Sequence, residues 1–201
     1  MEMRIREWMR LDYYDPAPIL IALREYERSG ALQGLPYEVA SLRTRELKPY
    51  LERRQCAMFA YLMGRVTQTL VSVAYSEASD YDAVMQHRVG DEVRFVPVQM
   101  KELAPSFLPY TKNLQGLIDG LSDKYPTSSD LTVAVHLNRD VTFRVQDLDL
   151  SRLNLGALWL FGGCDSTGEA WRVIGNLLSP SCSTEVFDYP SAPSALQPEL
   201  S

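Results

Sequence analysis

The chain has 201 residues, of which 46% are hydrophobic and 23% charged, the length and composition of one well-buried soluble domain. No apolar run approaches the roughly 20 residues that span a bilayer, and the N-terminal sequence MEMRIREW is not that of a signal peptide, so we expect no membrane association. Cys56, Cys164 and Cys182 are odd in number and widely separated, which favours free thiols over disulfides or a zinc site. We therefore expect a cytoplasmic protein.

The net charge of −6 is distributed unevenly along the chain. Residues 1–70 carry 11 Lys and Arg against 9 Asp and Glu, whereas residues 71–201 carry 9 against 17. Six basic and two acidic residues fall within 43–65. A basic helix there could contact phosphates, although an acidic molecule should attract nucleic acid weakly, and a solvated helix face accounts equally well for the cluster.

Helical and strand patterns follow one another in an order that predicts an α/β protein, with a mixed β-sheet flanked by helices. After an irregular start, we expect these elements in chain order: a helix over 16–29, a helix over 46–64, strands over 69–75, 82–89 and 92–100, a helix over 113–124, strands over 131–137, 141–145 and 157–161, and a helix over 166–178.

This order divides the chain into three parts. We expect an N-terminal helical extension over 1–45, an α/β core over 46–178, and a flexible tail rich in Ser and Pro over 179–201. The last helix of the core is expected from a capping-box pattern, Ser166-Thr-Gly-Glu169.

The two extended runs 82–89 and 92–100 are joined by Gly90-Asp91, which predicts a tight hairpin. Gly at the first of two central turn positions favours a type II′ turn, whose twist matches that of the strands it joins. Residues that face each other across this hairpin should have numbers that sum to 181.

This register places Asp82 opposite Gln99. Residues two apart in a strand share a face, so Lys101 joins them, with Asp80 at the edge of the patch. Pro97 makes no hydrogen bond in this ladder, but it cannot donate to a strand on its other side, so we expect an edge or a bulge there. The meeting of carboxylate, amide and ammonium groups predicts a functional site, and an ordinary polar hairpin is the alternative.

An Asp at the start of one strand followed by Gln99-Met100-Lys101 at the end of the next resembles the PD-(D/E)xK nuclease superfamily, in a Gln-x-Lys variant. The resemblance covers roughly 46–165, and it implies a restriction-endonuclease-like αβββαβ core that cleaves DNA with Mg²⁺. Asp82 matches the superfamily's conserved aspartate, and Glu52 matches a glutamate that many members carry on the first core helix. Asp82 is not preceded by the Pro of the signature, and the low pI of about 5.0 argues against strong DNA binding.

The resemblance implies that Glu52, Asp82 and Gln99 bind Mg²⁺ or Mn²⁺, with a backbone carbonyl from residue 100. Lys101 would position or deprotonate the attacking water, or balance charge in the transition state. A neutral amide at residue 99 lowers the charge of the site, so we expect weak, millimolar-range metal binding.

The expected function is therefore a metal-dependent nuclease, with DNA more probable as a substrate than RNA. Two alternatives remain open: a nuclease-fold protein that no longer cleaves and acts as a binding or interaction module, and an unrelated α/β protein with an incidental patch. His136 lies in a buried-type strand and is expected to be a core or sheet-end histidine more than a catalytic one.

Overall fold

The computed structural model describes residues 2–76, 80–109 and 111–191. It contains five α-helices, one short 3-10 helix and seven strands within these ranges. The helices are α1 (Glu2–Trp8), α2 (Pro16–Arg28), α3 (Tyr37–Ala40), α4 (Lys48–Thr67), α5 (Leu114–Lys124) and η1 (Val145–Asp147). The strands are β1 (Ser72–Tyr75), β2 (Ala83–Val89), β3 (Glu92–Leu103), β4 (Ser128–Leu137), β5 (Leu155–Gly163), β6 (Ala170–Gly175) and β7 (Ser183–Asp188).

All seven strands form one mixed sheet in which spatial order follows chain order. β1, β2 and β3 pair antiparallel, β3, β4 and β5 pair parallel, and β5, β6 and β7 return to antiparallel pairing. α5 provides the crossover that a parallel β3–β4 pair requires. The α/β class and the mixed sheet flanked by helices are confirmed.

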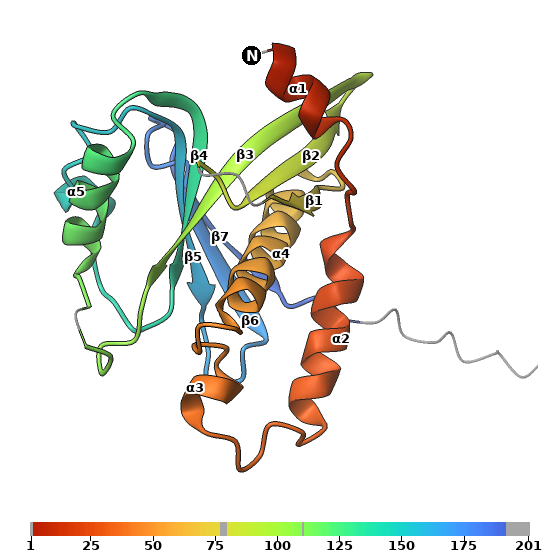
Figure 1. Ribbon diagram of the computed structural model, residues 1–201. Coiled ribbons are helices and arrows are strands. Elements are labelled where there is room, and N and C mark those ends of the chain that lie inside the picture. The colour runs from red at the N-terminus through yellow and green to blue at the C-terminus, as the bar shows by residue number, and fades with distance from the viewer. Residues whose placement is uncertain (1, 77–79, 110, 192–201) are drawn as a thin grey trace, which may run out of the picture.

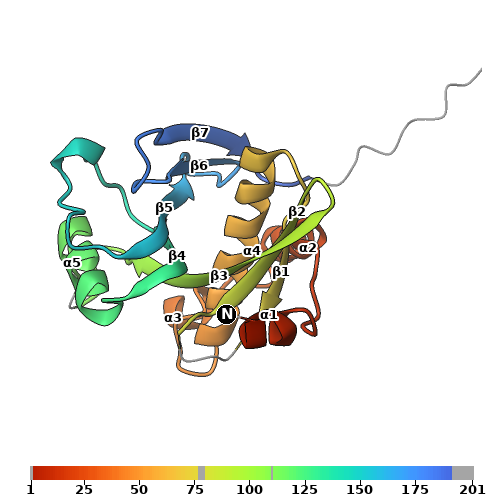
Figure 2. The same ribbon diagram turned by 90° about the horizontal axis from the view of Figure 1, so that it is seen from above.

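The sheet curls around α4, as Figure 2 shows from above, and α2 packs on the outer side of that helix (Figure 1). α4 is therefore covered on two sides, and its buried residues extend around the helix instead of forming one stripe. α5 lies on the opposite face of the sheet. Two hydrophobic cores result, one centred on Phe59 and Phe161 under α4, the other on Ile118 and Leu160 under α5.

The hairpin between β2 and β3 has the predicted register, from Val89 opposite Glu92 to Ala83 opposite Val98. Gly90 has a positive φ of 60° and the residue after it does not, which is the geometry of a type II′ turn.

The expectation for Pro97 is also met. β4 pairs with β3 only from Val98 onward, so the residue without an N–H lies just before the parallel ladder begins.

The prediction of a helix over 166–178 is wrong. Residues 170–175 form β6, which pairs antiparallel with β5. Instead of a helix N-terminus, the preceding loop is a β-turn region organised by Asp165, whose carboxylate accepts hydrogen bonds from Thr167 Oγ1 and from the backbone N–H groups of Glu169 and Ala170. The β-branched residues Val173 and Ile174 and the pairing with β5 outweigh the local capping pattern.

Two further expectations differ from the structure. Residues 141–145 do not form the expected strand, because 141–144 have no regular structure and η1 begins at Val145. The start of the chain is not irregular, since α1 covers residues 2–8.

The limits expected at residues 45 and 178 do not mark breaks in the fold. Tyr14 pairs with Val73 at the edge of the sheet, and α2 lies against α4. Within the expected tail, β7 adds the last strand of the sheet, and the Tyr189 hydroxyl donates to the Leu20 carbonyl at 2.8 Å. The remainder of the expected tail, residues 192–201, lies outside the described residues.

No helix in the described ranges is both long and apolar enough to cross a membrane. The three cysteines are free thiols, as predicted, with Cys56 buried and Cys164 exposed.

Candidate functional site

Asp82 is held at the point where the β2–β3 ladder ends. Its backbone N–H donates to the Val98 carbonyl at 2.9 Å, although Val98 already faces Ala83 in the register. Two consecutive residues therefore face one, which is the arrangement of a β-bulge. The Asp82 carbonyl accepts from the Ser76 N–H at 3.1 Å on the other side. The backbone of Asp82 is thus fixed from both neighbouring strands.

The carboxylate of Asp82 reaches across to β3. Its Oδ2 accepts from the backbone N–H of Met100 at 2.7 Å and from the side-chain Nε2 of Gln99. β2 has ended here, so the carboxylate replaces a backbone acceptor for the Met100 N–H. The structure brings Asp82 and Gln99 together, as the register predicts, although the bulge and not a regular pair produces the contact.

Gln99 is buried, with 5% of its surface exposed, and both ends of its amide are bonded. Nε2 faces Asp82 and also lies 3.3 Å from the Met100 carbonyl, while Oε1 accepts from the Tyr125 hydroxyl at 2.7 Å. The amide nitrogen therefore lies beside the two oxygens, from Asp82 and Met100, that the resemblance assigns to a cation.

Tyr125 was not predicted as part of this site. It is the C-cap residue of α5, and it is buried beneath two ammonium groups, with Lys101 Nζ at 5.8 Å and Lys124 Nζ at 5.1 Å from its ring centroid. The sequence gives little indication of this role, because only the crossover of α5 brings residue 125 under β3.

Lys101 lies two residues beyond Gln99 on β3 and is partly buried. Burial lowers the pKa of its ammonium group, and the nearby charge of Lys124 lowers it further, whereas Asp82 and Glu52 act in the opposite direction. At a given pH, a larger fraction of Lys101 is therefore neutral than of an ordinary lysine.

Glu52 lies in the N-terminal part of α4, where it forms an ion pair with Lys48 at 3.6 Å and its side chain is 40% exposed. Its charge acts on Lys101, and together with that of Asp82 it helps to raise the pKa of the buried Cys56 thiol, for which desolvation is the main cause. The structure thus bonds Asp82 directly to Gln99. Lys101 is linked to this pair through the ring of Tyr125 and through the charge of Asp82, and Glu52 acts on Lys101 through its charge.

Among the described residues, no group of three or more His, Cys, Asp or Glu side chains could hold a metal ion. The predicted ligand set contains two carboxylates, Glu52 and Asp82, with the Gln99 amide and a backbone carbonyl as the remaining donors. The amide oxygen of Gln99 faces Tyr125 in this structure, so the set fits a divalent cation only after that amide turns around.

A second polar cluster lies on the other face of β3. Arg43 pairs with Glu102 through both terminal nitrogens, at 3.1 and 2.7 Å, and Asn138 donates to the same carboxylate at 2.7 Å. Nearby, Gln55 Nε2 contacts His136 Nδ1 at 3.2 Å. His136 is therefore a bonded histidine at the end of a sheet strand, as the sequence indicates.

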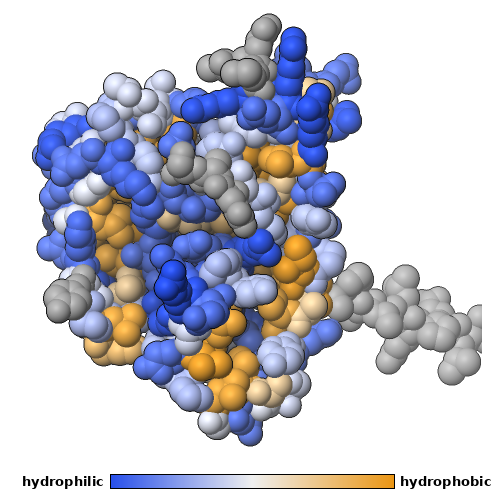
Figure 3. All heavy atoms as spheres, viewed as in Figure 1, coloured by the Kyte–Doolittle hydropathy of each residue, from blue (hydrophilic) through white to orange (hydrophobic). Residues whose placement is uncertain are grey.

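Several basic side chains in 43–65 make ion pairs or cation–π contacts with other parts of the fold. Arg54 pairs with Glu27 of α2 at 2.5 Å, and Arg53 lies over the rings of Tyr50 and Tyr75. The face of the molecule shown in Figure 3 accordingly mixes hydrophilic areas with small hydrophobic patches, one of them around α3. Arg53 and Arg54 therefore already have partners within the fold.

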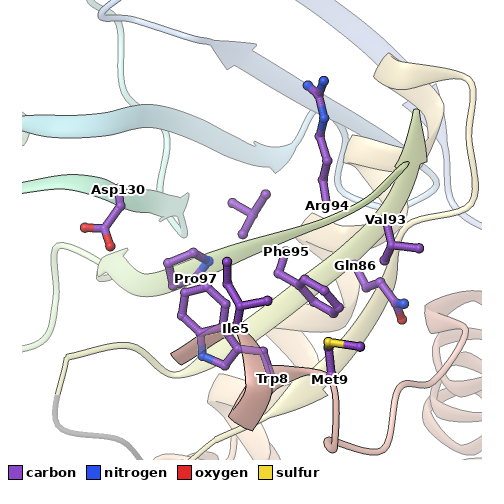
Figure 4. Close-up of a pocket in the computed structure, with 10 residues that line it drawn as sticks. Ile5, Trp8, Met9, Gln86, Val93, Arg94, Phe95, Pro97 and Asp130 are labelled. Atoms are coloured by element: carbon purple, nitrogen blue, oxygen red, sulfur yellow. The ribbon is translucent and has the colours of Figure 1, made fainter. Parts of the chain in front are cut away.

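An apolar pocket of about 610 Å³ lies elsewhere, between α1 and the β2–β3 hairpin. Figure 4 shows Ile5 and Trp8 of α1 beside Phe95 and Pro97 of β3, with Asp130 at one end. Its walls offer few groups capable of acid–base or nucleophilic chemistry, so the Asp82 cluster is the better candidate for a reaction.

Comparison with family models, with curated proteins and with solved structures finds no match to this chain. The chemistry of the residues described above is therefore the basis for assigning a function.

Proposed function

We propose that the protein is a metal-dependent nuclease that hydrolyses phosphodiester bonds, with DNA as the preferred substrate and Glu52, Asp82, Gln99 and Lys101 as the site. The observation that carries this proposal is the bonding of Asp82 to Gln99 and Met100 where the β2–β3 ladder ends, with Lys101 within range of the Asp82 charge. A carboxylate, an amide and a lysine with a lowered pKa are the groups that such a hydrolysis uses.

The order of elements supports the proposal. α4, β1, β2, β3, α5 and β4 follow one another as in the αβββαβ core of the PD-(D/E)xK superfamily, with an antiparallel β1–β2–β3 meander and a parallel β3–β4 pair. β5, β6 and β7 extend this arrangement. Free cysteines are compatible with a reducing, cytoplasmic setting.

Mg²⁺ or Mn²⁺ would be held by Asp82, Glu52, the Met100 carbonyl and the amide oxygen of Gln99. A cation held there would stabilise charge on the phosphoryl oxygens and lower the pKa of a bound water. Gln99 must first rotate its amide by a half-turn, so that Oε1 replaces Nε2 beside Asp82. The Tyr125 hydroxyl can accommodate both orientations, because it can donate to Oε1 or accept from Nε2.

Lys101 would act on the attacking water. Its pKa is lowered by burial and by Lys124, which increases the fraction of neutral amine able to accept a proton. In its protonated form the same group would balance negative charge on the transition state.

The first test is cleavage of mixed single- and double-stranded DNA and RNA with Mg²⁺ or Mn²⁺ by wild type and Asp82→Asn. Asn retains an oxygen acceptor for Met100 but removes the charge, so we expect cleavage to fall about a hundredfold or more. Asp123→Asn, which alters an exposed carboxylate on α5, is the matched control and should keep full activity. Folded wild type that cuts none of these substrates would refute the nuclease.

One observation favours a second candidate, a nuclease-fold binding module without catalysis. Asp82 Oδ2 is already bonded to Gln99 and Met100 and so has a structural role without any cation. In that case nucleic-acid binding would persist in EDTA, and calorimetry would detect no binding of Mg²⁺ or Mn²⁺ to wild type. Cation binding that Asp82→Asn abolishes would exclude this candidate.

A further inference from the structure

A pocket of about 490 Å³ lies at the carboxyl ends of β4 and β5, between these strands and α4. Its lining includes Gln55 and Arg54 of α4, His136 of β4 and Trp171 of β6. Ligands of α/β proteins are commonly bound outside the carboxyl ends of parallel strands. The volume falls in the range of small-molecule sites, roughly 300–1,000 Å³.

Three aromatic rings of this pocket share one orientation. His136 stacks on Phe161, with centroids 5.2 Å apart and planes 27° apart, and on Trp171, at 5.7 Å and 18°. Phe161 is buried, whereas His136 and Trp171 retain exposed surface. A flat ring that enters the pocket can therefore lie parallel to an existing stack.

A hydrogen bond between Gln55 and His136 fixes the orientation of both side chains in the pocket. Gln55 Nε2 donates to His136 Nδ1, which leaves the ring proton on Nε2 as a donor. Burial lowers the pKa of His136 to about 4, so the ring is neutral at physiological pH. Gln55 is itself 5% exposed, and its contact holds the imidazole in one tautomer.

The charges around the pocket are balanced and mostly paired. Arg43 is bound by Glu102 and Arg54 by Glu27, and Arg139 donates to the Lys112 carbonyl at 2.7 Å. Asp140 and Asp165 contribute negative charge to the lining. This balance does not favour a phosphate or another small anion. It suits an uncharged planar ring with its own donors and acceptors.

We infer that this pocket binds a nucleobase, stacked with Trp171 and hydrogen-bonded to His136. The inference rests on the proposed function for the source of the base, a strand of the nucleic-acid substrate. Lys101 and Glu102 are consecutive in β3 and point to opposite faces, and Glu102 bonds Arg43 of the pocket lining. The pocket and the Asp82 site therefore lie toward the same end of this strand, one on each face. A single-stranded nucleic acid that passes this end of the sheet would contact both the pocket and the Asp82 site.

The test is calorimetric titration of the full chain, in EDTA, with adenosine, with cytidine and with a short single-stranded DNA. EDTA separates the outcome from cleavage, so an inactive protein can still bind and an active one can still fail to bind. Ribose 5-phosphate, which has no base, is the control ligand. We expect saturable binding of at least one nucleoside and no binding of ribose 5-phosphate.

Trp171→Leu should weaken nucleoside binding about tenfold, the effect of losing one base–aromatic stack, whereas Trp171→Phe should retain most of it. Phe107→Leu, an exposed aromatic residue outside the pocket, should bind like wild type. His136→Asn, checked for folding by circular dichroism, provides a second variant within the pocket and should also bind more weakly.

Three results would overturn the inference: no nucleoside binding by wild type, equal binding of ribose 5-phosphate, or affinities unchanged in both Trp171→Leu and His136→Asn. Binding of single-stranded DNA but of no free nucleoside would place recognition in the strand backbone and would equally refute a base pocket.

Discussion

At the scale of single residues, the identity of residue 99 decides the state of the site. A neutral amide can donate to Asp82 in the absence of any cation, and Gln99 does so. A second carboxylate at this position could not, because an ionised carboxylate has no proton to donate and would repel the charge of Asp82. Gln99 therefore stabilises the arrangement of these groups without a cation.

Gln99→Glu should therefore change both the affinity for Mg²⁺ and the stability of the fold. Added negative charge should tighten binding of Mg²⁺ about tenfold or more, measured by calorimetry. In EDTA the variant should lose about 1–3 kcal/mol of unfolding free energy in urea, because Asp82 loses its donor. Gln33→Glu, at an exposed position before α3, should change neither quantity. Unchanged metal affinity in Gln99→Glu would mean that residue 99 is not a cation ligand.

His136 gives the stability of the protein a dependence on pH. Burial, reinforced by Arg54 and Arg43 and opposed by Glu102, lowers its pKa from 6.5 to about 4. Between these values the unfolded chain binds a proton that the folded chain does not. The free energy of unfolding should therefore fall as the pH is lowered from 6.5 to 4, by at most about 3 kcal/mol from this group.

Urea titrations at several pH values, compared between wild type and His136→Gln, measure this contribution. The variant should lose that part of the slope, whereas His87→Gln should retain it. Identical slopes in wild type and His136→Gln would show that His136 titrates normally in the folded protein.

At the scale of elements, side-chain contacts tie the segment before α4 to the end of β3. Arg43 and Glu102 form a bidentate pair with 14% and 17% of their side chains exposed. Burial opposes ionisation of Glu102, but its bonds to Arg43 and Asn138 outweigh that effect and lower its pKa. The pair therefore remains charged. It links the segment between α3 and α4 to the C-terminal end of β3.

Removing one partner should leave the other charge poorly compensated. We expect Arg43→Ala to lower the unfolding free energy by about 3 kcal/mol in urea denaturation. Arg152→Ala, which breaks the exposed pair with Asp123 at 2.8 Å, should cost less than about 1 kcal/mol. Equal losses in the two variants would contradict the importance of burial at Arg43.

At the scale of the whole molecule, a locally positive site lies on an acidic protein. Lys48 and Lys124 both lower the pKa of Lys101, so three ammonium groups act on one region although the net charge is −6. Such a cluster can guide a phosphate backbone locally, while the total charge keeps non-specific binding weak.

Lys124→Ala should therefore weaken nucleic-acid binding and reduce the slope of log K against log salt by about one. Fluorescence anisotropy with labelled DNA, in EDTA and at several salt concentrations, measures both effects. Arg88→Ala, at an exposed position near the hairpin tip, should leave the slope unchanged. A slope that does not respond to Lys124→Ala would place the phosphate contacts elsewhere.

The sequence by itself determined the local features that have a strong pattern. These are the long helix that became α4, the buried strands, the Gly90 turn and the pairing register that it sets. The register predicted that Asp82 and Gln99 lie close together, because a two-residue hairpin fixes which residues face each other. They do lie close together, although the bulge at Asp82, which the sequence does not predict, makes the contact.

Only the tertiary structure decided the rest. Tyr125 reaches Gln99 because the crossover places α5 beneath β3, and residues 170–175 form a strand because β5 offers an edge for pairing. Likewise, the orientation of the Gln99 amide follows from the Asp82 carboxylate and the Tyr125 hydroxyl, which lie 17 and 26 positions away in the chain. Contacts between distant segments depend on how elements pack, and a local pattern of residues carries no information about that packing.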